Sequence, residues 1–194
     1  QAKGPLTVPA TVIIPKGAGI MEIADRLKQA GVISNAKRFR FGIRLFGDTR
    51  PLRAGEFAFK SGMSTAQIIA HLQKGKTVVR KVTFAEGLSN LEIADILTKV
   101  PGLSGMLGPL PTEGQLLPET YHFSYGDSRV GLVKRMRTAM TRLLTEAWQS
   151  RSGDLPLKTP AEALVLASIV EKETGVASER RRVAGVFINR LRIG

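Results

Sequence analysis

Two glutamates, Glu171 and Glu173, lie at the end of a segment that is otherwise rich in apolar residues. The segment runs from Pro160 to Thr174, and the helical period places Glu173 on the face of Ile169 and Val170. A carboxyl held over apolar side chains is desolvated, which disfavours its charged form and suits a general acid. Glutamates at a helix end are also often plain solvated residues. The pattern alone leaves both interpretations open.

The elements that would position these carboxyls start with this segment itself. It is apolar nearly all round, which predicts a buried central helix, with Thr159 as the cap and Pro160 in the first turn. Further helices are predicted over 88–99, 130–150 and 179–191, and Gly/Pro-rich loops, the longest over 101–118, join them. Residues 85–194 therefore form a mainly helical domain.

A short element recurs three times in the first half of the chain. Each copy starts with a glycine and places an isoleucine four residues before a leucine on one helical face, over Gly17–Leu27, Gly62–Leu72 and Gly87–Leu97. A β-rich run precedes each copy, over 11–14, 56–59 and 77–84. Ser64 and Ser89 are expected to cap the second and third helices.

Another helix is expected over 35–45, capped by Ser34 or Asn35 and anchored by Phe39, Ile43 and Phe46. Residues 1–84 thus read as a small α+β module with paired strands, and the whole chain as α+β with a domain boundary near residue 85. A module of this kind suits binding better than catalysis.

The composition favours a folded chain with a polyanionic neighbour. Apolar residues make up 43% of the sequence and charged residues 23%, as in globular proteins, and the net charge is +13. Nucleic acid, an anionic membrane and the peptide-bearing cell wall all carry the negative charge that such a partner needs. Only two Tyr and one Trp are present, so the stacking platforms of nucleic-acid binders are not evident.

Other classes of site are disfavoured by what the sequence lacks. With no cysteine there is no thiol catalysis or disulfide, and the two histidines, His71 and His122, lack metal-ligand spacing. No stretch approaches the roughly 18 apolar residues of a membrane span. The chain begins with Gln1 rather than Met, and we expect a processed or truncated chain from which an upstream signal or anchor has been removed.

Several longer strings can be compared with known families. They are Ala167–Thr174, Ala177–Arg180 and Val183–Gly194 in the carboxyl-terminal part, Glu113–Tyr121 in the long loop, and Val82–Gly87 at the domain junction. Together they resemble the YceG-like (MltG) family of endolytic murein transglycosylases.

The resemblance implies a fold and a localisation. The family has a LysM-like module, here 1–84, ahead of a lytic transglycosylase domain, here 85–194, which would continue beyond Gly194. It implies a single-pass protein of the bacterial inner membrane whose catalytic part faces the periplasm. LysM elements bind N-acetylglucosamine-containing glycans, and this copy would either bind glycan or serve only for packing and positioning.

The resemblance also implies a reaction carried by one glutamate. Glu173-Thr174 is more similar to the Glu-Ser pair of lytic transglycosylases than Glu171-Lys172 is, so Glu173 is the expected acid/base and Glu171 the alternative. The glutamate protonates the bridging oxygen between N-acetylmuramic acid and N-acetylglucosamine, then takes the proton of the C6 hydroxyl, which closes a 1,6-anhydro ring. No second carboxylate, metal or cofactor is implied.

Other polar residues are expected around this acid. We place Glu113, Tyr121 and Asn189 in the cleft, with the 113–121 loop lining the same groove as the Glu173 end of the helix. Arg190 would pair with Glu171 or Glu173.

The expected partners are peptidoglycan strands and cell-wall synthases or other division and elongation proteins, but not nucleic acid. The competing hypotheses are a non-catalytic peptidoglycan-binding scaffold and a basic nucleic-acid binder, whose affinity would fall steeply with salt.

Overall fold

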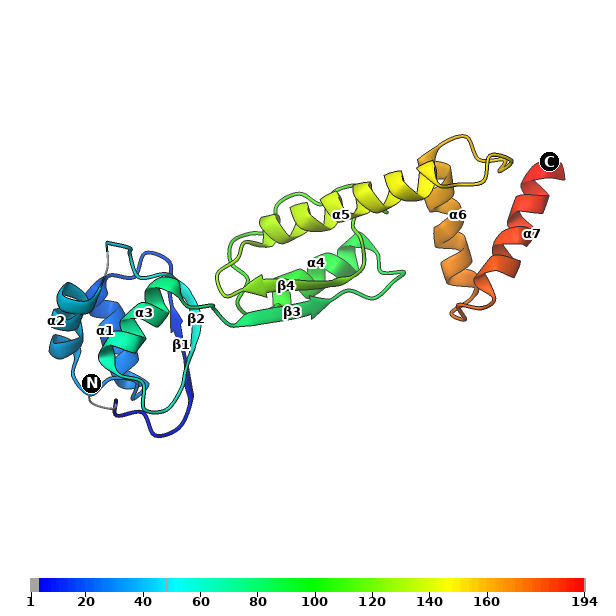
Figure 1. Ribbon diagram of the computed structural model, residues 1–194. Coiled ribbons are helices and arrows are strands. Elements are labelled where there is room, and N and C mark those ends of the chain that lie inside the picture. The colour runs from blue at the N-terminus through cyan, green and yellow to red at the C-terminus, as the bar shows by residue number, and fades with distance from the viewer. Residues whose placement is uncertain (1–3, 48, 194) are drawn as a thin grey trace. The chain divides into compact units, whose positions relative to one another are not determined.

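The computed structural model describes residues 4–47 and 49–193 and shows a mixed α+β chain (Figure 1). This confirms the expected α+β class. The chain divides into two compact units: the first comprises residues 1–81, 101–104 and 122–127, and the second 82–100, 105–121 and 128–194. That the first unit is LysM-like remains a prediction.

The first unit contains one antiparallel strand pair and three helices. They are β1 (Ala10–Ile14), α1 (Ile20–Gln29), α2 (Ala36–Phe46), β2 (Gly55–Phe59) and α3 (Thr65–Lys74). In the β1–β2 register Val12 lies opposite Phe57, and both are buried, whereas Thr11 and Ala58 are exposed. One face of the strand pair therefore contributes to a core shared with the helices.

The recurrent helices form as predicted, because their isoleucine and leucine positions meet a core. Ile23 and Leu27 in α1 and Ile68 and Leu72 in α3 are each no more than 2% exposed. The third copy is α4 (Asn90–Lys99) in the second unit, where Ile93 and Leu97 are buried to the same degree.

The predicted helix starts are also confirmed. Ser64 and Ser89 each form a capping box, in which the serine hydroxyl accepts from the backbone N–H three residues later and that residue's side chain accepts from the serine N–H. Gly62 and Gly87 precede the caps with φ of +71° and +77°, a region that favours glycine.

Helix α2 begins at its predicted cap but does not use all of its predicted anchors. The Asn35 side chain accepts from the N–H groups of Lys37 and Arg38. Phe39 is buried, but Phe46 is half exposed, so its assignment as an anchor was wrong.

Strand β4 (Thr120–Ser124) was not predicted from the sequence. It pairs with β3 (Val79–Thr83), which therefore does not join the sheet of β1 and β2. The boundary between the two units falls inside both strands, after Lys81 and after Tyr121.

The second unit is mainly helical, and its helices begin and end within two residues of the predicted limits. After α4 come α5 (Arg129–Gln149), α6 (Pro160–Glu173) and α7 (Arg180–Ile193). Its buried apolar residues come largely from α4 and the first half of α5, including Ile93, Leu97, Leu132 and Met136.

The expected localisation, a single-pass inner-membrane protein, is wrong for the part of the chain that the structure describes. None of the helices within residues 4–47 and 49–193 is both long enough and apolar enough to cross a membrane.

Candidate active site

Helix α6 carries both candidate glutamates at its carboxyl end. It begins with the predicted signals, since the Thr159 hydroxyl accepts from the Glu162 N–H and Pro160 occupies the first turn. It ends at Glu173, and Thr174 follows in an extended conformation. The two glutamates therefore lie in the last turn, immediately before the chain leaves the helix.

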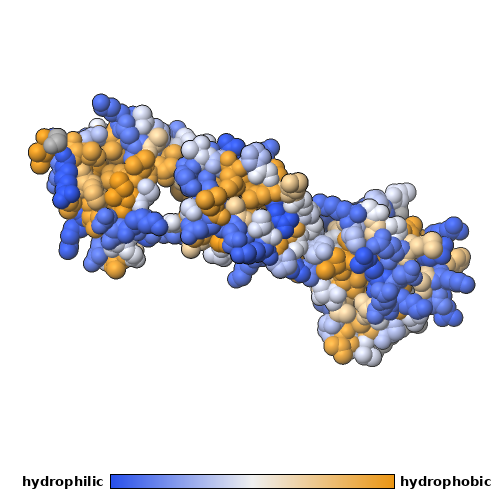
Figure 2. Space-filling view, turned by 180° about the vertical axis from the view of Figure 1, so that it is seen from behind, coloured by the Kyte–Doolittle hydropathy of each residue, from blue (hydrophilic) through white to orange (hydrophobic). Residues whose placement is uncertain are grey.

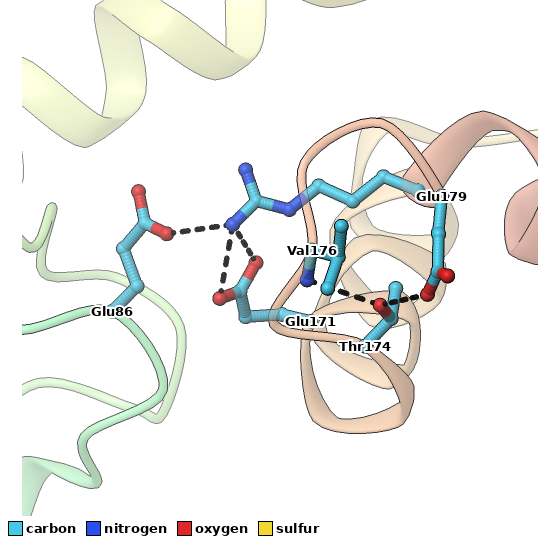
Figure 3. A network of polar contacts seen from close by, with 6 residues as sticks. Glu86, Glu171, Thr174, Val176 and Glu179 are labelled. Atoms are coloured by element: carbon cyan, nitrogen blue, oxygen red, sulfur yellow. Dashed lines mark hydrogen bonds and ion pairs between the residues drawn. The ribbon is translucent and has the colours of Figure 1, made fainter.

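A network of ion pairs holds Glu171 (Figure 3). Nη2 of Arg180 lies 2.9 Å from Oε2 of Glu171 and 3.1 Å from Oε2 of Glu86. Beside it, Nζ of Lys172 donates to the carbonyl of Gly87 at 3.1 Å. The end of α6 is thus tied to the start of α7 and to the turn that leads into α4.

Thr174 organises the turn between α6 and α7. Its side chain is buried, its hydroxyl donates to Oε2 of Glu179, and the same oxygen accepts from the N–H of Val176 (Figure 3). A hydroxyl that bonds the backbone two residues on is a common turn device. The residue after Glu173 therefore has a structural role that fixes where α6 stops.

Glu173 differs from Glu171 in its surroundings. Its side chain is exposed and forms no hydrogen bond or ion pair with the residues that the structure describes. The expected desolvation over Ile169 and Val170 is wrong, because Val170 is buried but Ile169 is 39% exposed. Of the two carboxyls, Glu173 is the one free to exchange a proton with a bound molecule.

The predicted shared cleft is also wrong, because Glu113 lies near the opposite end of α6. Residues 112–115 line a groove with Thr159–Ala161 and Leu164 of α6, not with its last turn. Glu173 lies nine positions after Leu164, which is about 14 Å at the rise of an α-helix. Both Glu113 carboxylate oxygens accept from the N–H of Asn90, at the start of α4.

Tyr121 is a core residue rather than a cleft residue. It is 9% exposed, its ring meets Phe84 edge-on, and its hydroxyl donates to the carbonyl of Leu117 at 2.9 Å. Burial, and then the nearby Glu119, raises the pKa of the phenol. A neutral, hydrogen-bonded phenol of this kind positions the chain and has no free proton to offer.

Helix α7 carries the two remaining predicted residues. Asn189 is exposed, and Arg190 lines an apolar groove between α6 and α7. The cation that pairs with Glu171 is Arg180 instead, so the expected pairing of Arg190 was wrong. Nothing in the sequence distinguishes Arg180 from its neighbours Arg181 and Arg182, and Glu86 is remote in the chain, so the network could not be predicted.

Helix α6 is not the buried central helix that its composition predicts. Val170 is its one buried residue, and Val165 is 59% exposed. The groove between α6 and α7, of about 610 Å³, is lined by Leu157, Leu166 and Phe187 among others. Figure 2 shows hydrophobic residues exposed among hydrophilic ones at the end of the chain that carries these two helices.

Within residues 4–47 and 49–193, no group of three His, Asp or Glu side chains is placed to hold a metal ion.

Comparisons with known proteins agree on one family. The sequence profile of the YceG-like family matches residues 12–194. Proteins named endolytic murein transglycosylase from Streptococcus pneumoniae (serotype 2, strain D39) and Bacillus subtilis (strain 168) are 28% and 25% identical to 93% and 92% of the chain. The chain spans only 40% and 58% of the length of these two relatives.

A solved structure gives a similar result at the level of sequence. The crystal structure of a protein from Listeria monocytogenes described as YceG-like is 27% identical, over 94% of this chain and 70% of that one, with a TM-score of 0.43. The family match includes every element from β3 to α7, and with them Glu171, Glu173 and Arg180. The chain belongs to the YceG-like family.

Proposed function

We propose that this chain is part of an endolytic murein transglycosylase, which cleaves the bond between N-acetylmuramic acid and N-acetylglucosamine within peptidoglycan strands. The names of the two relatives support this substrate class. The observation that carries the proposal is the difference between the two carboxyls at the end of α6. Glu171 is engaged by Arg180, whereas Glu173 has no partner among the described residues.

In this mechanism Glu173 acts first as an acid and then as a base. It donates its proton to the bridging oxygen, and the bond to the muramic acid C1 breaks with oxocarbenium character. The resulting carboxylate removes the proton of the C6 hydroxyl, whose oxygen bonds to C1 and closes the 1,6-anhydro ring. Since this nucleophile belongs to the substrate, the reaction needs no activated water. A strand lying over Glu173 would exclude water from the reacting atoms.

Glu171 has a different role in this proposal. Its carboxylate is paired with the Arg180 guanidinium and is therefore already occupied. It orients the last turn of α6 through Arg180 and Glu86 rather than exchanging protons. This division of roles makes Glu173, not Glu171, the catalytic residue.

The first unit would serve the same substrate. Its order β1, α1, α2, β2 is compatible with a LysM-like module, which would bind glycan or position the catalytic part. Cleavage of a strand still under synthesis would end its elongation, so cell-wall synthases and other division or elongation proteins are suitable partners. These roles are proposals for the whole protein.

The test compares Glu173→Gln with Glu171→Gln in the full-length protein. Gln keeps the shape but cannot donate and recover a proton, so release of anhydromuropeptides from purified peptidoglycan should fall about 10²–10⁴-fold or more for Glu173→Gln. Glu171→Gln should be far milder. The products are read by mass spectrometry, and thermal melts check that both variants fold.

The opposite pattern would reverse the assignment, and two active variants would end the single-glutamate mechanism.

One observation favours a second candidate function, a non-catalytic peptidoglycan-binding scaffold. Glu173 is exposed and lines none of the grooves described above. A wild-type protein that binds peptidoglycan and releases no anhydro ends would establish the scaffold instead.

A further inference from the structure

A second groove in the same unit has no assigned role. It has a volume of about 600 Å³ and lies between the 112–115 loop, the middle of α5 and the start of α6. Figure 1 shows α6 beginning beside the carboxyl-terminal part of α5. This volume is within the roughly 300–1,000 Å³ typical of ligand-binding pockets.

The loop that forms one wall is fixed on both sides. Glu113 accepts from the Asn90 N–H, and the Asn90 side chain donates to the carbonyl of Pro111 at 2.7 Å. Gly114 has a φ of +78°, and a Cβ on it would lie 2.9 Å from Cδ2 of Leu164. The backbone conformation therefore requires glycine, and the missing side chain lets the loop approach Leu164 of α6 closely. The groove is formed before any ligand binds.

The groove combines an apolar floor with a polar rim. Met140, Leu144 and Leu164 are half-buried, while Gln115 and Thr141 on the rim are exposed. Hydroxyl and amide groups that border apolar side chains match a sugar, which has an apolar ring face and hydroxyls at its edge.

Arg137 adds a cation to this rim. It is exposed, and its guanidinium forms no hydrogen bond or ion pair with the described residues. The carboxylate that shares the groove, Glu113, is occupied by the backbone of Asn90. A free guanidinium recognises carboxylates through paired hydrogen bonds. The ligand chemistry is therefore a saccharide that carries a carboxylate.

We infer that this groove is a remote subsite for a peptide-bearing muramic acid unit of the strand, with Arg137 binding a carboxylate of its peptide stem. The inference rests on the proposed function. Because the groove lies about 14 Å along α6 from Glu173, the unit bound there is not the one that is cleaved. The subsite would hold long, stem-bearing strands and favour cuts within them.

The test measures kcat and KM of the full-length protein on glycan strands of defined length, with stems and after enzymatic removal of the stems. Arg137→Ala should raise KM about tenfold on long stem-bearing strands, the size of one charge-assisted hydrogen bond. Its kcat should not change, and neither should KM on stem-free strands. Arg142→Ala is the matched control, since Arg142 lies on the same helix, is exposed and does not line the groove.

A direct binding measurement separates this inference from the proposed function. In the Glu173→Gln background, binding of a disaccharide-tetrapeptide should weaken with Arg137→Ala, and binding of a stem-free chitooligosaccharide should not. If cleavage fails but this Arg137-dependent binding persists, the function is wrong and the subsite stands. If Arg137→Ala behaves like Arg142→Ala in both measurements, or weakens both ligands equally, the subsite is overturned. Thr141→Val, which removes one rim hydroxyl at constant shape, should weaken both ligands, and no change would refute the saccharide assignment.

Discussion

The recurrent helices and the α6–α7 pair use apolar residues in different ways. In α1, α3 and α4 the apolar positions are few and lie on one face, and the key isoleucine and leucine residues are at most 2% exposed. Helix α6 is more apolar in sequence, but Val170 is its one buried residue, and the described residues of α7 include none. In this chain the helices that are buried are those with one apolar and one polar face, and not those with the highest apolar content.

The first unit and the α6–α7 pair therefore differ in the contacts that stabilise them. The core of the first unit is a continuous cluster that includes Phe39, Phe57, Phe59 and Leu72. The ends of α6 and α7 are held by ion pairs and a buried threonine, with part of their apolar surface in contact with water. Stability of the first unit should depend on packing, and placement of the candidate site on polar contacts.

The largest expected effect comes from truncating one apolar side chain in the first unit and one on α6 to alanine. Leu27→Ala removes a fully buried side chain from α1 and should lower the free energy of unfolding of the first unit by about 2–5 kcal/mol. Val165→Ala on the exposed face of α6 should change stability by about 0.5 kcal/mol or less. Hydrogen exchange in denaturant, read unit by unit, measures both. Equal losses would mean that α6 is buried in solution.

These differences also show what the sequence could predict. Capping serines, the isoleucine–leucine spacing and the glycine turns are local signals, and they located α1, α3 and α4 to within a few residues, while other local patterns located the remaining described helices. Strand β4 was missed because its inward residues, Tyr121 and Phe123, alternate with polar residues directly after a loop rich in Gly and Pro. A search for short period-two segments that end shortly before a glycine, here Gly126, would have found it.

The candidate site was harder to predict, because its contacts join residues remote in sequence. Periodicity put Glu173 over an apolar face but could not tell whether anything covers that face. Arg190, nineteen positions after Glu171, was expected to pair with Glu171 or Glu173, but the cation that pairs with Glu171 is Arg180, at the start of α7. Glu113 was expected in the cleft and instead accepts from the start of α4, a preference set by the helix dipole.

An intermediate effect is expected from replacing one arginine in the first unit, Arg80, and one at the start of α7, Arg180. Arg80 forms two hydrogen bonds to Glu56, whose side chain is 10% exposed, and this carboxylate raises the pKa of Arg80. Arg80→Met leaves that carboxylate without its cation and should cost about 2 kcal/mol.

Arg180→Met should cost about 1 kcal/mol or less, because the Arg180 and Glu171 side chains are 39% and 28% exposed and water screens the pair. Its larger consequence should be local, as faster hydrogen exchange in the 174–180 turn. Urea denaturation of both variants, with Lys replacements as controls that keep the charge, tests the order. A larger loss for Arg180→Met would show that the α6–α7 ends depend on this pair more than the first unit depends on Arg80.

The smallest expected effect concerns pH, and it compares Glu92 in α4 with Asp154 in the loop before α6. Bonds from the N–H and hydroxyl of Ser89 lower the pKa of Glu92, and a bond from Ser152, assisted by Arg192, lowers the pKa of Asp154. A carboxyl whose pKa is lower in the folded chain binds protons more readily when unfolded. Each group therefore contributes stability that is present above its ordinary pKa, 4.5 for Glu92 and 3.8 for Asp154, and is lost as the pH falls through the folded value. Because both side chains are exposed, the change should be slight, and the measurement is the urea midpoint between about pH 6 and pH 3.

Glu92→Gln should flatten this profile for the α4 region, and Asp154→Asn should do so only for the loop and α7. If neither variant alters the profile while NMR titration still shows both pKa values lowered, the unfolded chain must retain the same bonds, and the capping box of α4 would persist outside the fold.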